Sequence, residues 1–318
     1  VSKLRQVPRL VQAARDNIKE CPGIFVKSAL ESWRGTLKFI ESDVPRAFSA
    51  LDDLHILGDL ADTSTEAATA IMAYVEYLET DLAPRAKTSF RLGRDTLEKK
   101  LKVDEGITLG AERLLAIALR ELREVQEEFR SVAGRLNGGD PIATWRAVKE
   151  QHPEPGRLVP AAREQFLELQ EFLRCQSIVT MPDAEPVVIA ASPEFCRGSS
   201  AQVWTPGPFE NKASRAYSFV TDADGRWPQD RQREHMRDIN FSTLWSLSAH
   251  QAYPGNILLS QRLRRVHSKV RTSRFFAATS FVEGWAHYCE QMMVEVGFRR
   301  GEMAIKLGQL TTALAHLA

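Results

Sequence analysis

The sequence predicts a mainly helical protein that contains one short β segment, and three observations favour this fold class. Apolar residues recur at helical spacing through most of residues 1–175. Residues 176–220 hold many of the prolines together with short β-branched or aromatic runs, a pattern typical of strands. Helical spacing returns after Pro228. We therefore expect a helical scaffold over 1–175 and, in the same compact unit, a second part over 176–318.

The helices expected in the first half follow apolar stripes that end at helix-breaking residues. The first stripe ends at Pro22 and Gly23, and the strongest, within 108–135, sets Leu, Ile, Val and Phe opposite Glu and Arg. Stripes of this kind are more typical of scaffold packing than of a functional site. The expected helices cover residues 8–21, 26–43, 64–83, 108–135 and 158–175.

The β segment is expected around 185–221, where short runs are bounded by Pro, Gly and Asp. The expected strands are 185–193, 201–206 and 215–221, which would form a small sheet. The helices expected after the β segment cover about 229–253, 256–270, 276–297 and 301–317.

The composition describes a folded chain and argues against several classes of partner. Hydrophobic residues make up 43% and charged residues 26%, and the formal net charge is +1, so nothing favours nucleic acid as a partner. The apolar runs are shorter than the about 18 residues of a membrane span. The first residues lack the apolar core of a signal peptide, but the sequence starts without Met. Both a cytoplasmic location and export after signal cleavage therefore stay open.

A histidine stands at the end of an apolar helical run within residues 245–257. Pro254 lacks an N–H and its ring clashes with the preceding turn, so we expect the helix that contains His250 to break there. Gly255 then permits the chain to reverse. Such a break can aim the His250 side chain into a cleft. A lone histidine near a helix end more often caps the helix or packs in the core, and both interpretations stay open.

Three further polar residues fall on one face of a later expected helix. Glu283, His287 and Glu290 are spaced at i, i+4 and i+7, and their face neighbours Phe, Trp and Met residues. They cannot all be ordinary surface groups, and one interpretation is a functional site. The other is an internal network of ion pairs or hydrogen bonds with an arginine such as Arg271 or Arg274.

Several segments in the second half match one family pattern. They are TPGPFE (205–210), Tyr-x-Phe-Val-Thr (217–221), Trp-Pro (227–228), AHQAYPGN (249–256), SKVR (268–271) and FVEGWAHYCEQMM (281–293). On these segments the chain resembles DUF885, a bacterial family of zinc-peptidase-like proteins related to thermostable carboxypeptidases of the helical gluzincin type. The resemblance implies a helical zincin-like fold and zinc as the family's cofactor. Residues 8–135 are similar to the family's helical scaffold, and family members are usually longer at both ends.

The resemblance also implies roles for four residues. In the family the first motif is HExYPGH, whose two histidines and the Glu of a later EGWA segment are the metal ligands, and whose Glu is the general base. His250 then keeps the first ligand position and Glu283 the third. Asn256 stands at the second ligand position and Gln251 at the general-base position, so two essential positions carry amides.

These two amides predict a catalytically impaired, metallopeptidase-like protein. A Gln side chain cannot be protonated at a useful pH, which removes general acid–base help worth about 10²–10⁴-fold. The neutral oxygen of Asn is a poorer zinc ligand than imidazole, so we expect zinc to be weakly bound or absent. We expect the cleft to bind a peptide or protein ligand, either in a natural pseudo-peptidase or in an inactivated form of an active family member.

An active but atypical metallopeptidase, acting on short peptides, is the alternative. His287 follows Glu283 by one turn and would replace the missing ligand beside His250. Glu290 would then serve as a displaced base. Against this alternative, His287 also fits a role in supporting the ligands rather than joining them.

Two tyrosines near these motifs are weaker candidates for the site. Tyr217 and Tyr253 are able to donate a hydroxyl hydrogen bond to an oxyanion. Each would fit a core position equally well, with its hydroxyl satisfied by a neighbour.

Overall fold

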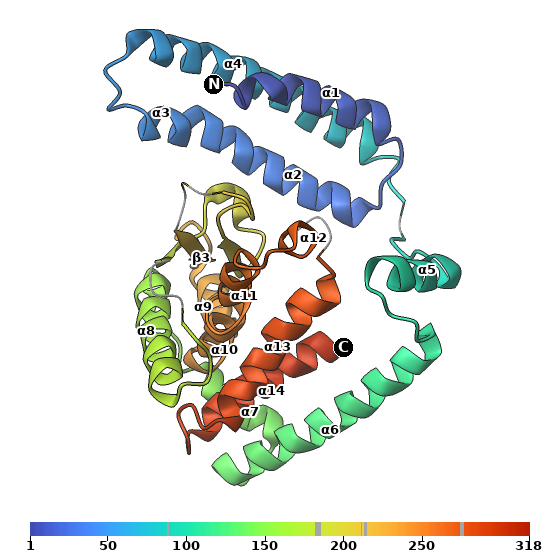
Figure 1. Cartoon of the computed structure of the whole chain (residues 1–318), viewed down its shortest axis with the longest axis vertical. Coiled ribbons are helices and arrows are strands. Elements are labelled where there is room, and N and C mark those ends of the chain that lie inside the picture. The colour runs from blue at the N-terminus through green and yellow to red at the C-terminus, as the bar shows by residue number, and fades with distance from the viewer. Residues whose placement is uncertain (88, 182–185, 211, 213–214, 274–276) are drawn as a thin grey trace. The chain divides into compact units, whose positions relative to one another are not determined.

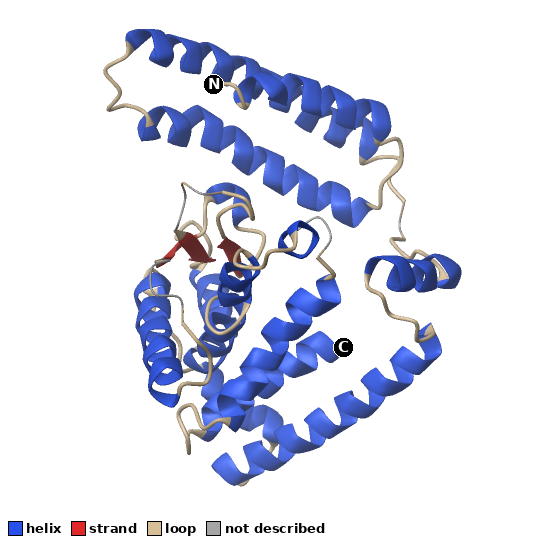
Figure 2. Cartoon of the chain, viewed as in Figure 1, coloured by secondary structure: helices blue, strands red, loops and turns tan. Residues whose placement is uncertain are grey.

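The computed structural model describes residues 1–87, 89–181, 186–210, 212, 215–273 and 277–318, and its elements are mostly helices (Figure 1). Among these described residues, strands are confined to one small region (Figure 2). The predicted fold class, mainly helical with a small β segment, is therefore confirmed. Within the described ranges, no helix combines the length and the apolar character needed to cross a bilayer.

The chain folds as two units whose boundary differs from the expected division near residue 175. One unit combines Val1–Leu92 with Pro193–Ser199, and the other combines Gly93–Ser192 with Ser200–Ala318. Residue 175 lies inside the second unit, close to the end of a helix. The difference arises because residues 93–175, expected in the helical scaffold, belong to the second unit, and the short segment Pro193–Ser199 belongs to the first.

The first unit contains α1 (Val7–Asn17), α2 (Gly23–Lys38), α3 (Val44–Ala47) and α4 (Leu54–Tyr77), with short turns η1 (Leu4–Gln6), η2 (Phe39–Asp43) and η3 (Leu78–Leu82). Buried side chains from α1, α2 and α4, among them Val11, Val26 and Tyr74, form its core. The 3-10 turn η4 (Glu194–Cys196) packs on α2 at Gly35, where an added Cβ would lie 2.6 Å from the Cα of Phe195. Only a glycine permits this approach.

Three helices of this unit differ from their expected bounds. The helix expected at 8–21 is α1, which already ends at Asn17. The helix expected at 64–83 begins at Leu54, because Asp53 caps it by accepting hydrogen bonds from the N–H groups of His55 and Ile56. The helix expected at 26–43 begins at Gly23 and ends in the π-helical turn η2.

The second unit contains α5 (Arg94–Asp104), α6 (Ala111–Asn137), α7 (Pro141–Lys149), α8 (Leu158–Gln176), α9 (Gln229–Asp238), α10 (Phe241–Gln251), α11 (Asn256–Leu263), α12 (Lys269–Thr272), α13 (Thr279–Glu295) and α14 (Met303–Leu317). Two of them, α5 and α7, were not predicted. For α7 the start signals are present, since Asp140 caps the helix and Pro141 occupies its first turn.

The small sheet has the strand order β1-β3-β2. The strand β1 (Val187–Ala191) pairs in parallel with β3 (Ala216–Val220), and β2 (Ala201–Trp204) pairs antiparallel to β3. The three strands fall within the expected ranges 185–193, 201–206 and 215–221, although residue 185 itself lies outside the described residues.

The helices expected at 229–253 and 256–270 are each divided in the structure. The first becomes α9 and α10, because the fully buried Asn240 ends one run and caps the next by accepting hydrogen bonds from Ser242 N–H and Thr243 N–H. The second becomes α11 and the short α12. For the helix expected at 276–297, residue 276 is outside the described residues and α13 begins at Thr279.

The helix α10 lies at the centre of the second unit and contacts α8, α13 and α14. Its Trp245 is buried in the main core with Leu169, Met293 and Phe298. In Figure 1, α13 and α14 lie side by side, and the two helices also contact one another. Against α10, α14 approaches so closely that a Cβ added to Gly308 would lie 1.8 Å from the backbone oxygen of Ser242. This close packing determines which side chains of α14 lie beside the end of α10.

Candidate functional site

The predicted break after His250 is present. The helix α10 ends at Gln251, the Tyr253–Pro254 peptide bond is cis, and α11 begins at Asn256. A Cβ added to Gly255 would lie 1.9 Å from the backbone oxygen of His250, so only glycine lets the reversed chain pass this point. The result is a tight corner that holds His250 and Asn256 at adjoining helix ends.

The buried His250 side chain lies between two carboxylates that α13 supplies. Its Nδ1 is 2.7 Å from Glu290 Oε1, and its Nε2 is 3.1 Å from Glu283 Oε2. Burial by itself lowers the pKa of His250, but the hydrogen bonds and charges of Glu290 and Glu283 outweigh burial and hold that pKa above its usual range. Each ring nitrogen of His250 thus lies within hydrogen-bond distance of a carboxylate oxygen.

Glu290 is fully buried and makes several polar contacts. Ser246 donates a hydrogen bond to Oε2, while His250 faces Oε1 and the His287 Nδ1 lies 3.8 Å from the same oxygen. Burial raises the pKa of Glu290, but the hydrogen bonds from His250 and Ser246, together with the nearby His287, outweigh this effect and leave the pKa below its usual range. Glu290 is therefore a buried, ionised acceptor whose partners are all neutral or cationic.

A third histidine, His316 on α14, joins this group. Its Nδ1 lies 2.9 Å from the Nδ1 of His287, and the two rings stand edge-on, with centroids 4.7 Å apart. The centroid of the His250 ring is 5.8 Å from that of His316. Burial lowers the pKa of His316, and the neighbouring His287 and His250 act in the same direction. No sequence pattern marked His316 as a candidate, because a single histidine in an apolar helix carries no motif.

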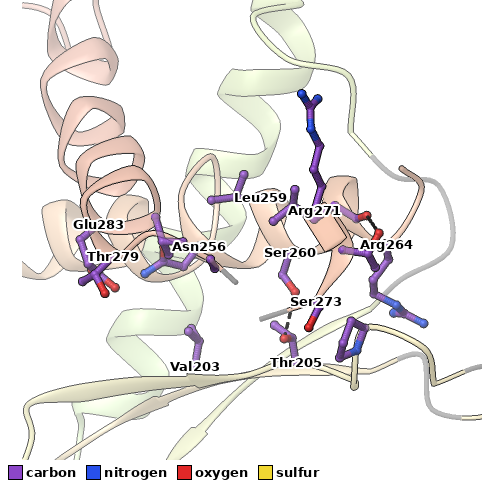
Figure 3. A pocket seen from close by; sticks show the side chains of 15 residues that line it. Val203, Thr205, Asn256, Leu259, Ser260, Arg264, Arg271, Ser273, Thr279 and Glu283 are labelled. Atoms are coloured by element: carbon purple, nitrogen blue, oxygen red, sulfur yellow. Dashed lines mark hydrogen bonds between the residues drawn. The ribbon is translucent and has the colours of Figure 1, made fainter. Parts of the chain in front are cut away.

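A first cavity, of about 320 Å³, lies between α11, α12, α13 and the strand β2. Its lining includes Asn256, Glu283, Val203 and Arg271, and Figure 3 shows Asn256 and Glu283 at one end with Arg271 far from them. The buried Oδ1 of Asn256 has no hydrogen-bond partner among the described residues. The three positions that the resemblance assigns to metal ligands are thus close together: Asn256 and Glu283 share this cavity, and Glu283 bonds to His250.

A second cavity, of about 380 Å³, lies between α10, α13 and α14. It is lined by His250, Gln251, Glu290 and His316, with Thr312 beside them. The residue at the general-base position, Gln251, therefore lines a different cavity from Asn256 and Glu283.

The other residues that the sequence offered as site candidates are Tyr217, Tyr253, Arg271 and Arg274. The buried Tyr253 donates its hydroxyl hydrogen bond to Gln261 Oε1 at 2.9 Å, and Tyr217 stacks on Phe219 within the sheet. Among the described residues, neither tyrosine lines either cavity. The carboxylates of α13 pair with histidines in the contacts above, while Arg271 lines the first cavity. Arg274 lies outside the described residues.

The fold and this histidine–carboxylate group define a mainly helical protein with a polar cluster at the centre of its second unit. The family model described as a bacterial protein of unknown function (DUF885) matches residues 1–318, so the chain belongs to the DUF885 family. A search of curated proteins gives no match.

Solved structures that are similar to the chain include two that are described as putative lipoproteins. One is described as a "putative lipoprotein of unknown function" from Shewanella oneidensis, with a TM-score of 0.67, 24% identity and coverage of 99% of this chain. The other is described as a "putative lipoprotein" from Colwellia psychrerythraea, with a TM-score of 0.74, 15% identity and coverage of 99% of this chain. The chain spans 59% and 57% of those two proteins, and at these identities the likeness concerns the fold alone.

Proposed function

We propose that this DUF885 protein is a metallopeptidase-like protein that binds a peptide in its first cavity and has lost efficient hydrolysis. The observation that carries the proposal is the direct hydrogen bond between His250 Nε2 and Glu283 Oε2 beside Asn256, with Gln251 lining the other cavity. Imidazole and carboxylate groups are retained, whereas both replaced positions carry amides that neither ionise nor exchange protons.

The donor set at the first cavity fits a divalent cation only weakly. His250, Glu283 and Asn256 would supply one nitrogen, one carboxylate oxygen and one amide oxygen, and the unpartnered Oδ1 of Asn256 is compatible with facing a cation. Zinc, when bound at such a site, polarises a substrate carbonyl and activates water. An amide oxygen is a weaker zinc donor than imidazole, so the affinity should be lower than that of a two-histidine site.

Proton transfer is the step that this chain is least equipped to perform. A general base must accept a proton within hydrogen-bond reach of the reacting water and later return it. Gln251 cannot do so at any useful pH. Glu290 is a carboxylate, but it is fully buried and already accepts hydrogen bonds from Ser246 and His250. We therefore assign Glu290 to holding His250 rather than to acting as a displaced base.

The lining of the first cavity supports a peptide as ligand. Leu259, Leu263 and Val282 give it an apolar wall, and Arg271 adds a positive charge at some distance from Glu283. Its volume of about 320 Å³ is at the lower end for small-ligand sites. An apolar side chain together with an acidic group, as at the carboxyl end of a short peptide, would match this lining.

The test compares wild type with the double variant Gln251→Glu/Asn256→His, using a quenched fluorescent pool of short peptides in the presence of Zn²⁺. We expect no hydrolysis by wild type and measurable, chelator-sensitive hydrolysis by the double variant. Efficient hydrolysis by wild type would overturn the proposal and favour the active metallopeptidase that uses His250, Glu283 and His287.

Peptide binding is tested separately by fluorescence anisotropy with a labelled short-peptide pool. Arg271→Ala should weaken peptide binding. Arg120→Ala, which removes an exposed arginine that pairs with Glu121 on α6, should leave peptide binding unchanged. Equal binding by both variants and by wild type would contradict the assignment of the first cavity.

A further inference from the structure

We propose that His250, Glu290 and His316, assisted by His287, form a binding site for a divalent first-row metal ion in the second cavity. This site differs from the His250–Glu283–Asn256 set. It uses a residue of α14 that belongs to no motif discussed above, and it requires neither peptide binding nor hydrolysis.

The distances in this group are close to those of a metal site. The candidate ligand atoms of His250, Glu290 and His316 all lie within 4.8 Å of one another. His250 Nδ1 is 2.7 Å from Glu290 Oε1, and His287 Nδ1 is 3.8 Å from that oxygen and 2.9 Å from His316 Nδ1. In a tetrahedral site with bonds of about 2.0–2.1 Å, neighbouring ligand atoms are separated by about 3.3 Å. The observed values bracket this separation, so small rotations of the rings would suffice.

The types of donor also fit a transition metal. Two imidazoles and one carboxylate form a set that holds zinc in catalytic sites and other first-row metals elsewhere. The adjacent Cys289 is buried, and its sulfur is not among the candidate ligand atoms that converge in this group. The site would therefore have nitrogen and oxygen donors without sulfur.

Burial and charge give a second, independent argument. Glu290 is fully buried, and three histidine rings gather on its side of α13. The Nδ1 atoms of His287 and His316 face one another, so without a metal ion one of them must carry a proton and donate a hydrogen bond to the other. A metal ion would let neutral rings direct their lone pairs to one point and would neutralise the buried carboxylate.

Neighbouring hydroxyl groups already orient the carboxylate. Ser246 donates to Glu290 Oε2, which directs the other oxygen, Oε1, towards the histidines. Thr312 on α14 is 3.5 Å from the Ser246 hydroxyl and extends this chain of contacts. Metal ligands are commonly supported in this way, because fixing the ligand lowers the cost of organising the site.

The second cavity provides access to the group. His250, Glu290 and His316 line its volume of about 380 Å³, and His316 is exposed. A metal ion can therefore enter from solvent, and a water molecule can fill a remaining coordination position. His250 points its Nδ1 to this side and its Nε2 to Glu283, so the two candidate sites depend on opposite nitrogens of one ring.

The experiment strips the protein with a chelator, dialyses the chelator away and titrates Zn²⁺ by calorimetry, with elemental analysis for stoichiometry. We expect about one zinc per chain in wild type. His316→Ala should weaken binding by more than the about 10–100-fold that follows loss of a supporting group. The matched control is His267→Ala, which removes an exposed histidine of the same unit and should leave the affinity unchanged.

Glu283→Gln separates the two sites. It should retain zinc if the metal lies in the second cavity, and it should lose zinc if the metal lies between His250 and Glu283. Loss of zinc in Glu283→Gln with retention in His316→Ala would overturn the proposal. So would the absence of zinc binding by wild type that circular dichroism shows to be folded.

Cobalt gives a readout that is independent of affinity. Co²⁺ bound at a tetrahedral site of nitrogen and oxygen ligands absorbs visible light, and the spectrum should change in His287→Asn, whose side chain can no longer approach the metal as an imidazole. A Co²⁺ spectrum that is identical in wild type, His287→Asn and His316→Ala would contradict the assigned ligands.

Discussion

The two sides of His250 differ in how they are built. On one side, Glu283 and Asn256 belong to segments with a distinctive order of residues, and they line the first cavity. On the other side, Glu290 accepts a hydrogen bond from Ser246, which lies within an ordinary apolar helix. His316 from α14 lies close to the same carboxylate. The side with Glu283 and Asn256 can be predicted from the spacing of residues in the sequence. The side with Glu290 and His316 exists only because α14 packs against α10 and α13.

The largest expected effect comes from separating α14 from α10. In Gly308→Val a side chain would occupy the position now held by the backbone of Ser242, since even a Cβ would lie 1.8 Å from that oxygen. We expect a loss of about 3 kcal/mol in the free energy of unfolding. Gly134→Val is the control, because an added Cβ meets nothing within 4 Å on α6. Equal losses in urea denaturation would show that close α10–α14 packing is not needed.

A smaller effect should distinguish the two carboxylates that hold His250. Glu290 is fully buried, so Glu290→Gln replaces an ionised acceptor of Ser246 and His250 by an amide and should cost about 2 kcal/mol. The Glu283 side chain is 55% exposed, and Glu283→Gln should cost about 0.5 kcal/mol or less. Urea denaturation measures the loss in the free energy of unfolding for both variants, and a chelator in the solution removes any contribution from bound metal. If Glu283→Gln destabilised the protein more than Glu290→Gln, the contact of His250 with Glu283 would be the one that supports the fold.

The smallest effect concerns the start of α13 and depends on pH. Glu105 accepts a hydrogen bond from the backbone N–H of Ser280 at 2.8 Å, and this bond lowers the pKa of Glu105. A lowered pKa in the folded state stabilises the protein above the unfolded pKa, and the stabilisation is lost as the pH falls through the folded value. Between about pH 6 and pH 3, wild type should therefore lose more stability than Glu105→Gln.

Urea midpoints over that pH range measure this difference, with Glu127→Gln as the matched control. Glu127 is an exposed glutamate on α6, and its replacement should leave the acid dependence as in wild type. If Glu105→Gln shows the same acid dependence as wild type, the carboxylate contributes nothing to holding the helix that carries Glu283 and Glu290.

Several helix boundaries show where sequence periodicity stops being informative. The expected helix 229–253 was divided because Asn240 is buried and caps a new helix, a role that periodicity does not reveal. For α7, the local start signals of Asp140 and Pro141 were present but short. The segment Pro193–Ser199 joined the first unit through its contact at Gly35, which no local pattern indicates.

The sequence by itself determined the helical class, the position of the small sheet, the break after His250 and the common face of Glu283 and Glu290. These features depend on side-chain periodicity and on the restricted backbone of proline and glycine, which act over a few residues.

Only the tertiary structure decided which groups meet His250, that two cavities lie on either side of it, and that His316 joins Glu290. Those outcomes depend on how closely helices pack, and that closeness is set by single small residues such as Gly308 and Gly255 at contacts between distant or reversed segments.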